Sequence, residues 1–392
     1  MERNLDFDTV IDRKNTRSLK FDHAVARGLP EDVLSLWVAD MDFKTSSYIE
    51  DALQERIRHG IFGYSEPVPG DSYYEAVHDW LFMRHGLETK EEWIVKTPGV
   101  VYALAMAVRA YTEPGDAVMI EQPVYYPFAG VIKENGRRIV NSDLKQDETG
   151  RYRMDFADME QKLKTENVKL FLLCSPHNPV GRVWEKEELM QLGELCLKYN
   201  VPVVSDEIHC DYVFRGKHIP FATLDKRFEE NSITCTAPSK TFNLATMMLA
   251  NILIPREDLR KKFIHEMDAC GLDQMSVFGL TACEAAYRHG GEWYEAVSKY
   301  IGANMEFTKD FIAKELPGVT MTETEGTYLM WLDFRALGLS TKELDDRIIH
   351  KAKLWLDSGK IFGKAGEGFQ RINAACPRTT LTECLTRLKS VL

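Results

Sequence analysis

Residues 235–245 read Cys235-Thr236-Ala237-Pro238-Ser239-Lys240-Thr241-Phe242-Asn243-Leu244-Ala245 and place a lysine directly after a β-rich segment, 232–236. An ammonium group in an apolar environment loses hydration, so the pKa of a buried lysine falls from about 10.4 towards neutrality. A lysine with a lowered pKa is a nucleophile towards carbonyls and can form a Schiff base. The same pattern also fits an exposed loop lysine, because most lysines are exposed. The rest of the chain has to decide between the two interpretations.

Length and composition narrow the class of protein. The chain has 392 residues with 44% hydrophobic content, which is enough for one large domain and a smaller one. The net charge is −11 and no block is rich in Lys or Arg, so we expect no nucleic-acid partner. No apolar run approaches the roughly 18 residues of a membrane span, so we expect no membrane association.

The start of the chain and the cysteines indicate the compartment of the cell in which the protein is found. Residues 1–8 are mixed and acidic, so no signal peptide is visible. The eight cysteines are scattered and form no CxxC pair, which favours buried thiols in a reducing compartment over disulfides or a zinc site. We therefore expect a cytoplasmic protein without a bound metal.

Strand-like and helical patterns alternate through the middle of the chain. The strand-like runs are 92–95, 116–120, 169–174, 201–209 and 232–236, and helical patterns occupy 72–85, 128–135 and 185–199. This alternation predicts a parallel sheet with helices on both faces. Ligands of such sheets bind beyond the carboxyl ends of the strands. Four polar residues each follow the end of a different predicted strand, so we expect them to meet: Tyr125, Asn178, Asp206 and Lys240.

The two ends of the chain differ from this middle part. Residues 34–43 form a strand-like apolar run that closes in acids, and 46–59 has helical spacing. Residues 256–316 are charged and helical, with a break at His289-Gly290-Gly291. Two strands, at 319–321 and 327–332, a helix at 341–352 and a last helix follow. The pattern predicts a second, smaller α+β domain.

The chemistry of these residues suits pyridoxal phosphate, a carbonyl cofactor that takes up a lysine amine and has an Asp partner for its ring nitrogen. Gly99 lies between a strand and an Ala-rich helix, so the N–H groups of Val100 and Val101 form an anion site for the phosphate, together with the Ser239 hydroxyl. Asp206 would pair with the ring nitrogen and Tyr125 would stack on the ring.

Two further residues complete this interpretation, and each residue of the set has an ordinary alternative. Asn178 would donate to the phenolic oxygen, and Arg371 would hold a substrate carboxylate with its planar fork. Asp206 could instead be a helix cap, Tyr125 core packing and Asn178 a turn residue before proline. Arg371 could be part of a surface salt bridge. Their joint position at successive strand ends favours the functional interpretation.

Four motifs carry a family resemblance over nearly the whole chain. They are Ser175-Pro176-His177-Asn178-Pro179-Val180-Gly181, Ser205-Asp206-Glu207-Ile208-His209, the segment 239–245 and Arg371-Ile372-Asn373. As a set, they resemble the fold-type I enzymes of the aminotransferase superfamily, which depend on pyridoxal phosphate. Within it, the segments 37–43, 62–64, 206–211 and 373–378 resemble the MalY/PatB-type cystathionine β-lyases, which are C–S lyases.

The resemblance implies a fold and an assembly. The fold class is α/β, an aspartate aminotransferase-like fold with a mostly parallel seven-stranded sheet in the large domain and a smaller α+β domain. We expect the large cofactor-binding domain at residues 46–285 and the small C-terminal domain at 286–392. Residues 1–45 would form an N-terminal segment that packs with the small domain. The resemblance also implies a homodimer with the active site at the subunit interface.

The resemblance also assigns site residues. The catalytic residues would be Lys240, Asp206 and Tyr125; the cofactor would be bound by these three with Asn178, Gly99, Val100, Val101, Ser239, His209 and, from the neighbouring subunit, Tyr64; the amino-acid substrate would be bound by Arg371, Tyr64 and Ala39. Two positions depart from the superfamily pattern. Ala237 stands where many members have a phosphate-binding serine, so Ser239 must carry more of that contact, and Thr246 stands where glycine is common.

These residues support more than one function. The first hypothesis is α,β-elimination from cystathionine or cysteine-type thioethers, which gives pyruvate, ammonia and a thiol. The alternative is an aminotransferase that acts on an amino acid and a 2-oxo acid, because both reactions begin with removal of the Cα proton. A third hypothesis is a protein that mainly binds a regulatory partner. A nicotinamide enzyme is not expected, because no GxGxxG follows the first strands.

Overall fold

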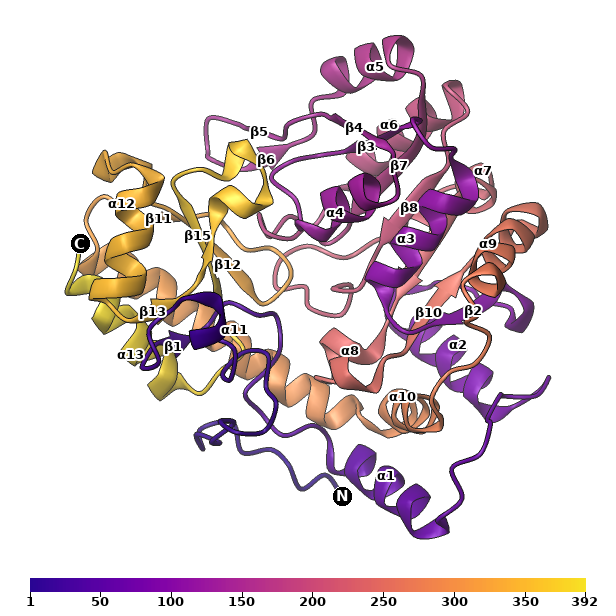
Figure 1. Cartoon of the computed structure of the whole chain (residues 1–392), viewed down its shortest axis with the longest axis horizontal. Coiled ribbons are helices and arrows are strands. Elements are labelled where there is room, and N and C mark those ends of the chain that lie inside the picture. Colours follow the sequence, from indigo (N-terminus) through magenta and orange to yellow (C-terminus); the bar gives the residue numbers. More distant parts are fainter.

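A seven-stranded sheet forms the centre of the protein (Figure 1), whose computed structural model describes residues 1–392. In sheet order the strands are β2 (Ile94–Thr97), β10 (Ala250–Leu253), β9 (Ser232–Thr236), β8 (Val203–Asp206), β7 (Val168–Cys174), β3 (Ala117–Ile120) and β4 (Arg138–Asn141). The pairs from β9 to β4 are parallel, whereas β10 runs antiparallel to both of its neighbours. The predicted α/β class with a mostly parallel seven-stranded sheet is confirmed.

Helices cover both faces of this sheet. One face carries α3 (Val100–Tyr111), α4 (Pro127–Glu134) and α9 (Glu257–Ala269), and the other carries α5 (Phe156–Thr165), α6 (Lys186–Lys198) and α7 (Lys226–Glu230). Successive residues of β7 alternate between the two apolar cores: Leu170 and Leu172 belong to the first, Phe171 and Leu173 to the second. Because both faces are buried, the strand reads as a continuous apolar run instead of an alternating one.

A second, four-stranded antiparallel sheet lies in the C-terminal part of the chain (Figure 1). Its order is β11 (Thr320–Met321), β12 (Leu329–Asp333), β15 (Phe369–Asn373) and β14 (Asp357–Ser358), and α11 (Gly291–Glu315), α12 (Thr341–Asp346) and α13 (Arg378–Lys389) accompany it. Near the N-terminus, β1 (Leu34–Ser35) pairs in parallel with β13 (Leu354–Trp355). The N-terminal segment thus lies against the C-terminal part.

A third group of helices is centred on α10 (Val277–His289), which packs against α1 (Ser47–His59), α2 (Ser72–His85) and the start of the long helix α11. These three helices share one apolar cluster of 51 buried residues with α11, α13 and β12. No helix of the structure has the length and apolar character that crossing a membrane requires.

Three expectations about elements differ from the structure. The run 34–43 is not one strand: only β1 is paired, and the following residues are held instead by side chains such as Asn373, which donates to the Val38 carbonyl at 2.7 Å. The expected strand 201–209 ends at Asp206, where the backbone turns. The helical region 256–316 has a second break, at 270–276. The strand β4 and the hairpin of β5 (Lys145–Gln146) and β6 (Tyr152–Arg153) were not expected, because their sequences are polar.

Candidate active site

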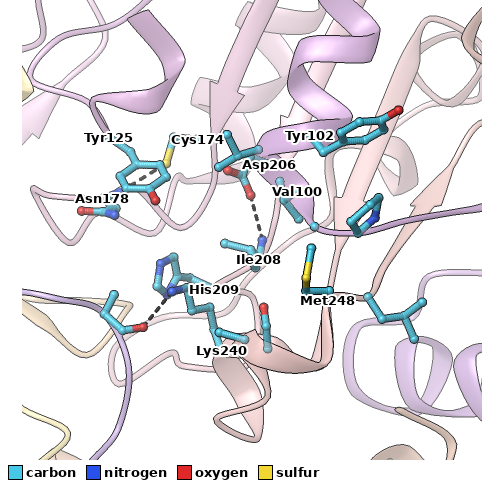
Figure 2. A pocket seen from close by; sticks show the side chains of 17 residues that line it. Val100, Tyr102, Tyr125, Cys174, Asn178, Asp206, Ile208, His209, Lys240 and Met248 are labelled. Atoms are coloured by element: carbon cyan, nitrogen blue, oxygen red, sulfur yellow. Dashed lines mark hydrogen bonds between the residues drawn. The ribbon is translucent and has the colours of Figure 1, made fainter. Parts of the chain in front are cut away.

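A cavity of about 430 Å³ opens at the carboxyl ends of four neighbouring parallel strands (Figure 2). Its walls include Asp206, the last residue of β8, and Tyr125, Asn178 and Lys240, which follow β3, β7 and β9 respectively. Because parallel neighbours end at the same edge of a sheet, residues that are far apart in the sequence meet here. The structure therefore brings together the four residues that the strand ends singled out.

Lys240 lies on α8 (Pro238–Thr241), a single helical turn that begins two residues after β9. Its Nζ donates to the Ala39 carbonyl at 2.7 Å, so the predicted substrate-binding residue contacts the amine through its backbone. Loss of hydration in the cavity lowers the pKa of Lys240 to about 8; the carboxylate of Asp40 opposes this shift, Arg371 adds to it and Asp206 opposes it. An amine with this pKa is neutral, and so available as a base or nucleophile, in a much larger fraction of molecules near neutral pH than an ordinary lysine is.

Asp206 is the last residue of β8 and only 4% exposed. Its Oδ1 accepts the Ile208 N–H at 3.2 Å, which closes a turn, so the interpretation of Asp206 as a helix cap is wrong. Burial raises the pKa of this carboxyl to about 7, although the Ile208 hydrogen bond and the charge of Lys240 act against the shift. A buried carboxyl of this kind is stabilised as an anion once a cation is placed beside it.

The part of the cavity at the start of α3 is suited to an anion. The helix α3 starts immediately after Gly99, and Gly99, Val100 and Val101 all line the cavity. The first N–H groups of a helix have no partner within it, and the helix dipole makes this end positive. Ser239 lies on the wall of the same cavity and adds a hydroxyl. This is the arrangement that the glycine turn predicted for a phosphate.

Arg371 lies behind the wall, next to Asn178, and is 2% exposed. Its Nη1 donates to Asn178 Oδ1 at 2.9 Å, and its Nη2 donates to the Trp37 carbonyl at 2.8 Å and to the carboxylate of Asp357. The Nε of Arg371 has no partner. The interpretation as a surface salt bridge is wrong, because the ion pair with Asp357 is buried.

Tyr125 and His209 are neutral groups at the cavity. Burial raises the pKa of Tyr125 well above its usual value, and the Tyr125 N–H donates to the Asn178 carbonyl at 2.9 Å. Burial lowers the pKa of His209 well below its usual value, and its Nδ1 has no hydrogen-bond partner. Tyr64, by contrast, lies on a loop with 96% exposure and does not line the cavity of its own chain.

Several lining residues were not predicted from the sequence. They are Pro98, Tyr102, Cys174, Ile208, Ala245, Met248 and Leu249. Most of them are neighbours of predicted residues: Tyr102 lies in the first turn of α3, and Ile208 follows Asp206 by two positions. For Met248 and Leu249 we find no signal in the sequence beyond their apolar character.

The side chains present fit pyridoxal phosphate. Figure 2 shows Lys240, Asp206, Tyr125 and Asn178 around one space, with Val100 from the start of α3 at its margin. An amine of lowered pKa and a buried carboxyl without a bound cation face the same cavity as the free end of a helix. The buried, unpartnered Nδ1 of His209 is a further polar atom that a ligand in the cavity can satisfy.

Comparison with known proteins agrees with this site. Residues 31–388 match the model of the family "Aminotransferase class I and II". Cystathionine beta-lyase PatB of Bacillus subtilis is 46% identical over 389 residues, which are 99% of this chain and 100% of PatB. The structure of cystalysin from Treponema denticola, which contains a pyridoxal 5'-phosphate cofactor, has a TM-score of 0.94 at 40% identity and covers 98% of each chain.

A second solved structure is equally similar. The PLP-bound putative aminotransferase from Clostridium difficile 630 has a TM-score of 0.95 at 42% identity, covering 98% of this chain and 99% of that one. The family match spans most of the chain, and the relatives match from end to end. The chain therefore belongs to the aminotransferase class I and II family of fold-type I enzymes and, within it, to the MalY/PatB-type group.

Proposed function

We propose that this protein is a pyridoxal-phosphate-dependent C–S β-lyase that cleaves cystathionine and cysteine-type thioethers by α,β-elimination to pyruvate, ammonia and a thiol. The observation that carries the proposal is the Lys240 amine, with a pKa lowered to about 8, in a cavity it shares with the buried carboxyl of Asp206. The 46% identity to a cystathionine beta-lyase over the full length supports the choice of reaction.

The start of α3 and six side chains would hold the cofactor. Its phosphate would take the N–H groups of α3 and the Ser239 hydroxyl, and its ring nitrogen would pair with Asp206. Tyr125, Asn178 and His209 would contact the ring from the cavity wall, and Lys240 would hold the cofactor covalently. When bound, pyridoxal phosphate supplies an aldehyde carbon that takes up amines and a ring that draws the electron pair away from the substrate Cα.

Lys240 would move the proton. A lysine whose pKa is about 8 has a neutral Nζ in a substantial fraction of molecules near neutral pH, so it can remove a proton from the substrate Cα. The Ala39 carbonyl accepts a hydrogen bond from Nζ at 2.7 Å and so fixes the direction in which the amine points. Asp206, as a carboxylate beside the ring nitrogen, would keep that nitrogen protonated and the ring electron-withdrawing.

Arg371 would bind the substrate carboxylate. Its guanidinium is buried beside Asn178, and its Nε carries an N–H without a partner. The paired Asp357 keeps the buried cation compensated while no substrate is present. An incoming carboxylate would then form a second charged contact with a group that is already oriented.

The homodimer is part of this proposal. Tyr64 is 96% exposed, and three apolar side chains of the same loop, Ile61, Phe62 and Val68, are also exposed, at 66%, 57% and 65%. A loop of this kind fits an interface with a second copy, in which Tyr64 would reach the phosphate of the partner's cofactor. Mixed after unfolding and refolding, the inactive variants Tyr64→Phe and Lys240→Ala should regain about a quarter of the activity, because half of the dimers then hold one intact site. Activity that never exceeds that of the separate variants would contradict a shared site.

The division into domains and the location complete the proposal. Residues 46–285 would be the large domain, 286–392 the small domain, and 1–45 a segment attached to the small domain. The pairing of β1 with β13 supports the last point, and the strands of the two sheets do not mix along the chain. Seven of the eight cysteines are buried and all are unpaired, which supports a cytoplasmic location, to be checked by cell fractionation.

The test is a substrate panel followed for two products. Purified enzyme with pyridoxal phosphate is given cystathionine, cysteine and thioether analogues, and pyruvate and free thiol are measured with and without an added 2-oxo acid. We expect pyruvate and thiol in equal amounts and no dependence on the 2-oxo acid, and Lys240→Ala should abolish both. Rapid transfer of the amino group to the 2-oxo acid without pyruvate would replace the proposal by the aminotransferase alternative.

A further inference from the structure

Two cations from the N-terminal segment hold the acidic end of the run 37–43. Both Nη atoms of Arg13 bind Asp40, at 3.2 and 2.6 Å, and its Nη1 also donates to Asp42 at 2.7 Å. The Lys20 side chain is fully buried, donates to Asp42 at 2.8 Å and lies 3.5 Å from Asp40. Two cations thus face two carboxylates, and the cluster is neutral as a whole.

The residue next to Asp40 in the sequence, Ala39, contacts the reacting amine of Lys240. Ala39, which precedes Asp40, presents its carbonyl to Lys240 Nζ at 2.7 Å and to the Tyr328 hydroxyl at 3.0 Å. The Asp40 carboxylate also acts through space, because its charge opposes the desolvation that lowers the pKa of Lys240.

Asn373 holds the backbone on either side of Ala39, because its Nδ2 donates to the carbonyls of Val38 and Asp40 at 2.7 and 2.6 Å. Arg13 binds the side chain of Asp40, so it acts on the same short segment and on the negative charge near the amine.

We propose that Arg13 is a positioning residue for the chemistry of Lys240: together with Asn373 it holds the Ala39 carbonyl against the amine, and together with Lys20 it neutralises Asp40. The inference rests on the proposed function only in that Lys240 is the reacting amine; it does not depend on the substrate or on the bond that breaks. An arginine suits this task because its planar guanidinium binds both oxygens of one carboxylate and stays charged at all working pH values.

The other groups around Lys240 do not compete for this role. Asp206 faces the amine from the end of β8 and Arg371 from β15, and their effects on the pKa of Lys240 have opposite signs. His209 and Tyr328 are uncharged near neutral pH, because burial lowers the pKa of the histidine and raises that of the tyrosine. None of these four contacts Arg13, so its replacement leaves them in place.

The test removes the positive charge of Arg13 or the negative charge of Asp40 in the holoenzyme and compares the effect on the protonation of the nitrogen that joins Lys240 to the cofactor. The cofactor bound to Lys240 would absorb in the near-visible at a wavelength that depends on whether the joining nitrogen is protonated, so a pH titration of the absorbance gives the midpoint of that protonation. Arg13→Gln leaves Asp40 and Asp42 with Lys20 as their one cation and should raise the midpoint by about half to one pH unit, whereas Asp40→Asn should lower it by a similar amount. The double variant should return to within about 0.3 of the wild-type midpoint.

Two variants serve as controls. Arg3→Gln removes a cation from the same N-terminal segment, but Arg3 pairs with Asp51 at the surface, where the two side chains are 59% and 52% exposed. It should leave the midpoint unchanged. Arg13→Lys keeps the charge but not the two-pronged bond, so it should give a midpoint between those of the wild type and Arg13→Gln.

The sign of the shifts decides the inference. If Arg13→Gln and Asp40→Asn move the midpoint in the same direction, or not at all, the inference is overturned. A loosened structure around Lys240 would admit water in both variants and so shift both midpoints the same way. Should a variant lose its cofactor, the pH dependence of Lys240 acetylation in the full-length chain, measured by mass spectrometry, replaces the absorbance. Opposite shifts in a protein that forms no pyruvate would support this inference while removing the lyase proposal.

Discussion

The buried carboxyl of Asp206 is expected to cost stability in the absence of the cofactor. Its pKa is raised from 3.8 to about 7 by burial, so the folded chain keeps a proton that the unfolded chain releases near pH 4. The stability contributed by this proton is lost as the pH rises through about 7. Above pH 7.5 the full difference of about three pKa units acts, and the carboxylate destabilises the folded protein by about 4 kcal/mol. At pH 4.5 the unfolded carboxyl has only just ionised, and the destabilisation is about 1 kcal/mol.

Asp206→Asn should therefore stabilise the cofactor-free protein, because asparagine keeps an acceptor for the Ile208 N–H without a charge. For a chain of 392 residues the entropy of unfolding is about 0.8 kcal/mol per kelvin, so the melting temperature should rise by about 5 °C at pH 8 and about 1 °C at pH 4.5. With pyridoxal phosphate the order should reverse, since asparagine cannot pair with a protonated ring nitrogen. Differential scanning calorimetry at both pH values, with and without cofactor, measures all four differences.

Asp211→Asn is the matched control. Asp211 is also buried, but His85 and Thr241 donate to its carboxylate at 2.9 and 2.6 Å, and these bonds, with the charge of Arg84, lower its pKa in spite of burial. Its replacement should destabilise the protein at both pH values by similar amounts, because a lowered carboxyl pKa contributes stability at every pH above the unfolded value of 3.8. The reasoning is refuted if Asp206→Asn lowers the melting temperature at pH 8, or if its gain does not grow between the two pH values.

Two further predictions concern the side chains of Lys20 and Lys240. Lys20→Met should lower the stability by about 3–5 kcal/mol, or about 4–6 °C in melting temperature, because it leaves the buried carboxylate of Asp42 and the half-buried one of Asp40 with one cation; Lys14→Met, at an exposed position nearby, should change little. Equal effects of both replacements would contradict the role of the ion pairs. For Lys240, whose pKa is lowered to about 8 and whose amine is free only after the substrate has displaced it from the cofactor, kcat for cystathionine should rise with pH through about 8 and then level off. A stopped assay between pH 6 and 9.5 measures this profile, and a profile that falls over the same range would exclude the neutral amine as the base.

The central sheet and the set of residues at its edge could be predicted from the sequence. The strands β3, β7, β8 and β9 are short apolar runs between turn residues, and such runs need no distant information to be recognised. Parallel neighbours end at one edge, which is why the strand ends alone were enough to group Tyr125, Asn178, Asp206 and Lys240. The irregular path of 36–43 could not be predicted, because its apolar residues are held by side-chain contacts with Asn243 and Asn373 and not by a strand partner.

Local pattern and turn chemistry thus determined which residues end the strands, because hydrophobic periodicity is a property of neighbouring residues. Only the tertiary structure decided what surrounds those residues. The Ala39 carbonyl reaches Lys240 across 201 positions of sequence, and Arg371 reaches Asn178 across 193. Such contacts depend on how the N-terminal segment and the C-terminal sheet pack against the central sheet. The pKa values of Lys240 and Asp206 depend on the same packing, because desolvation is set by everything that encloses a group.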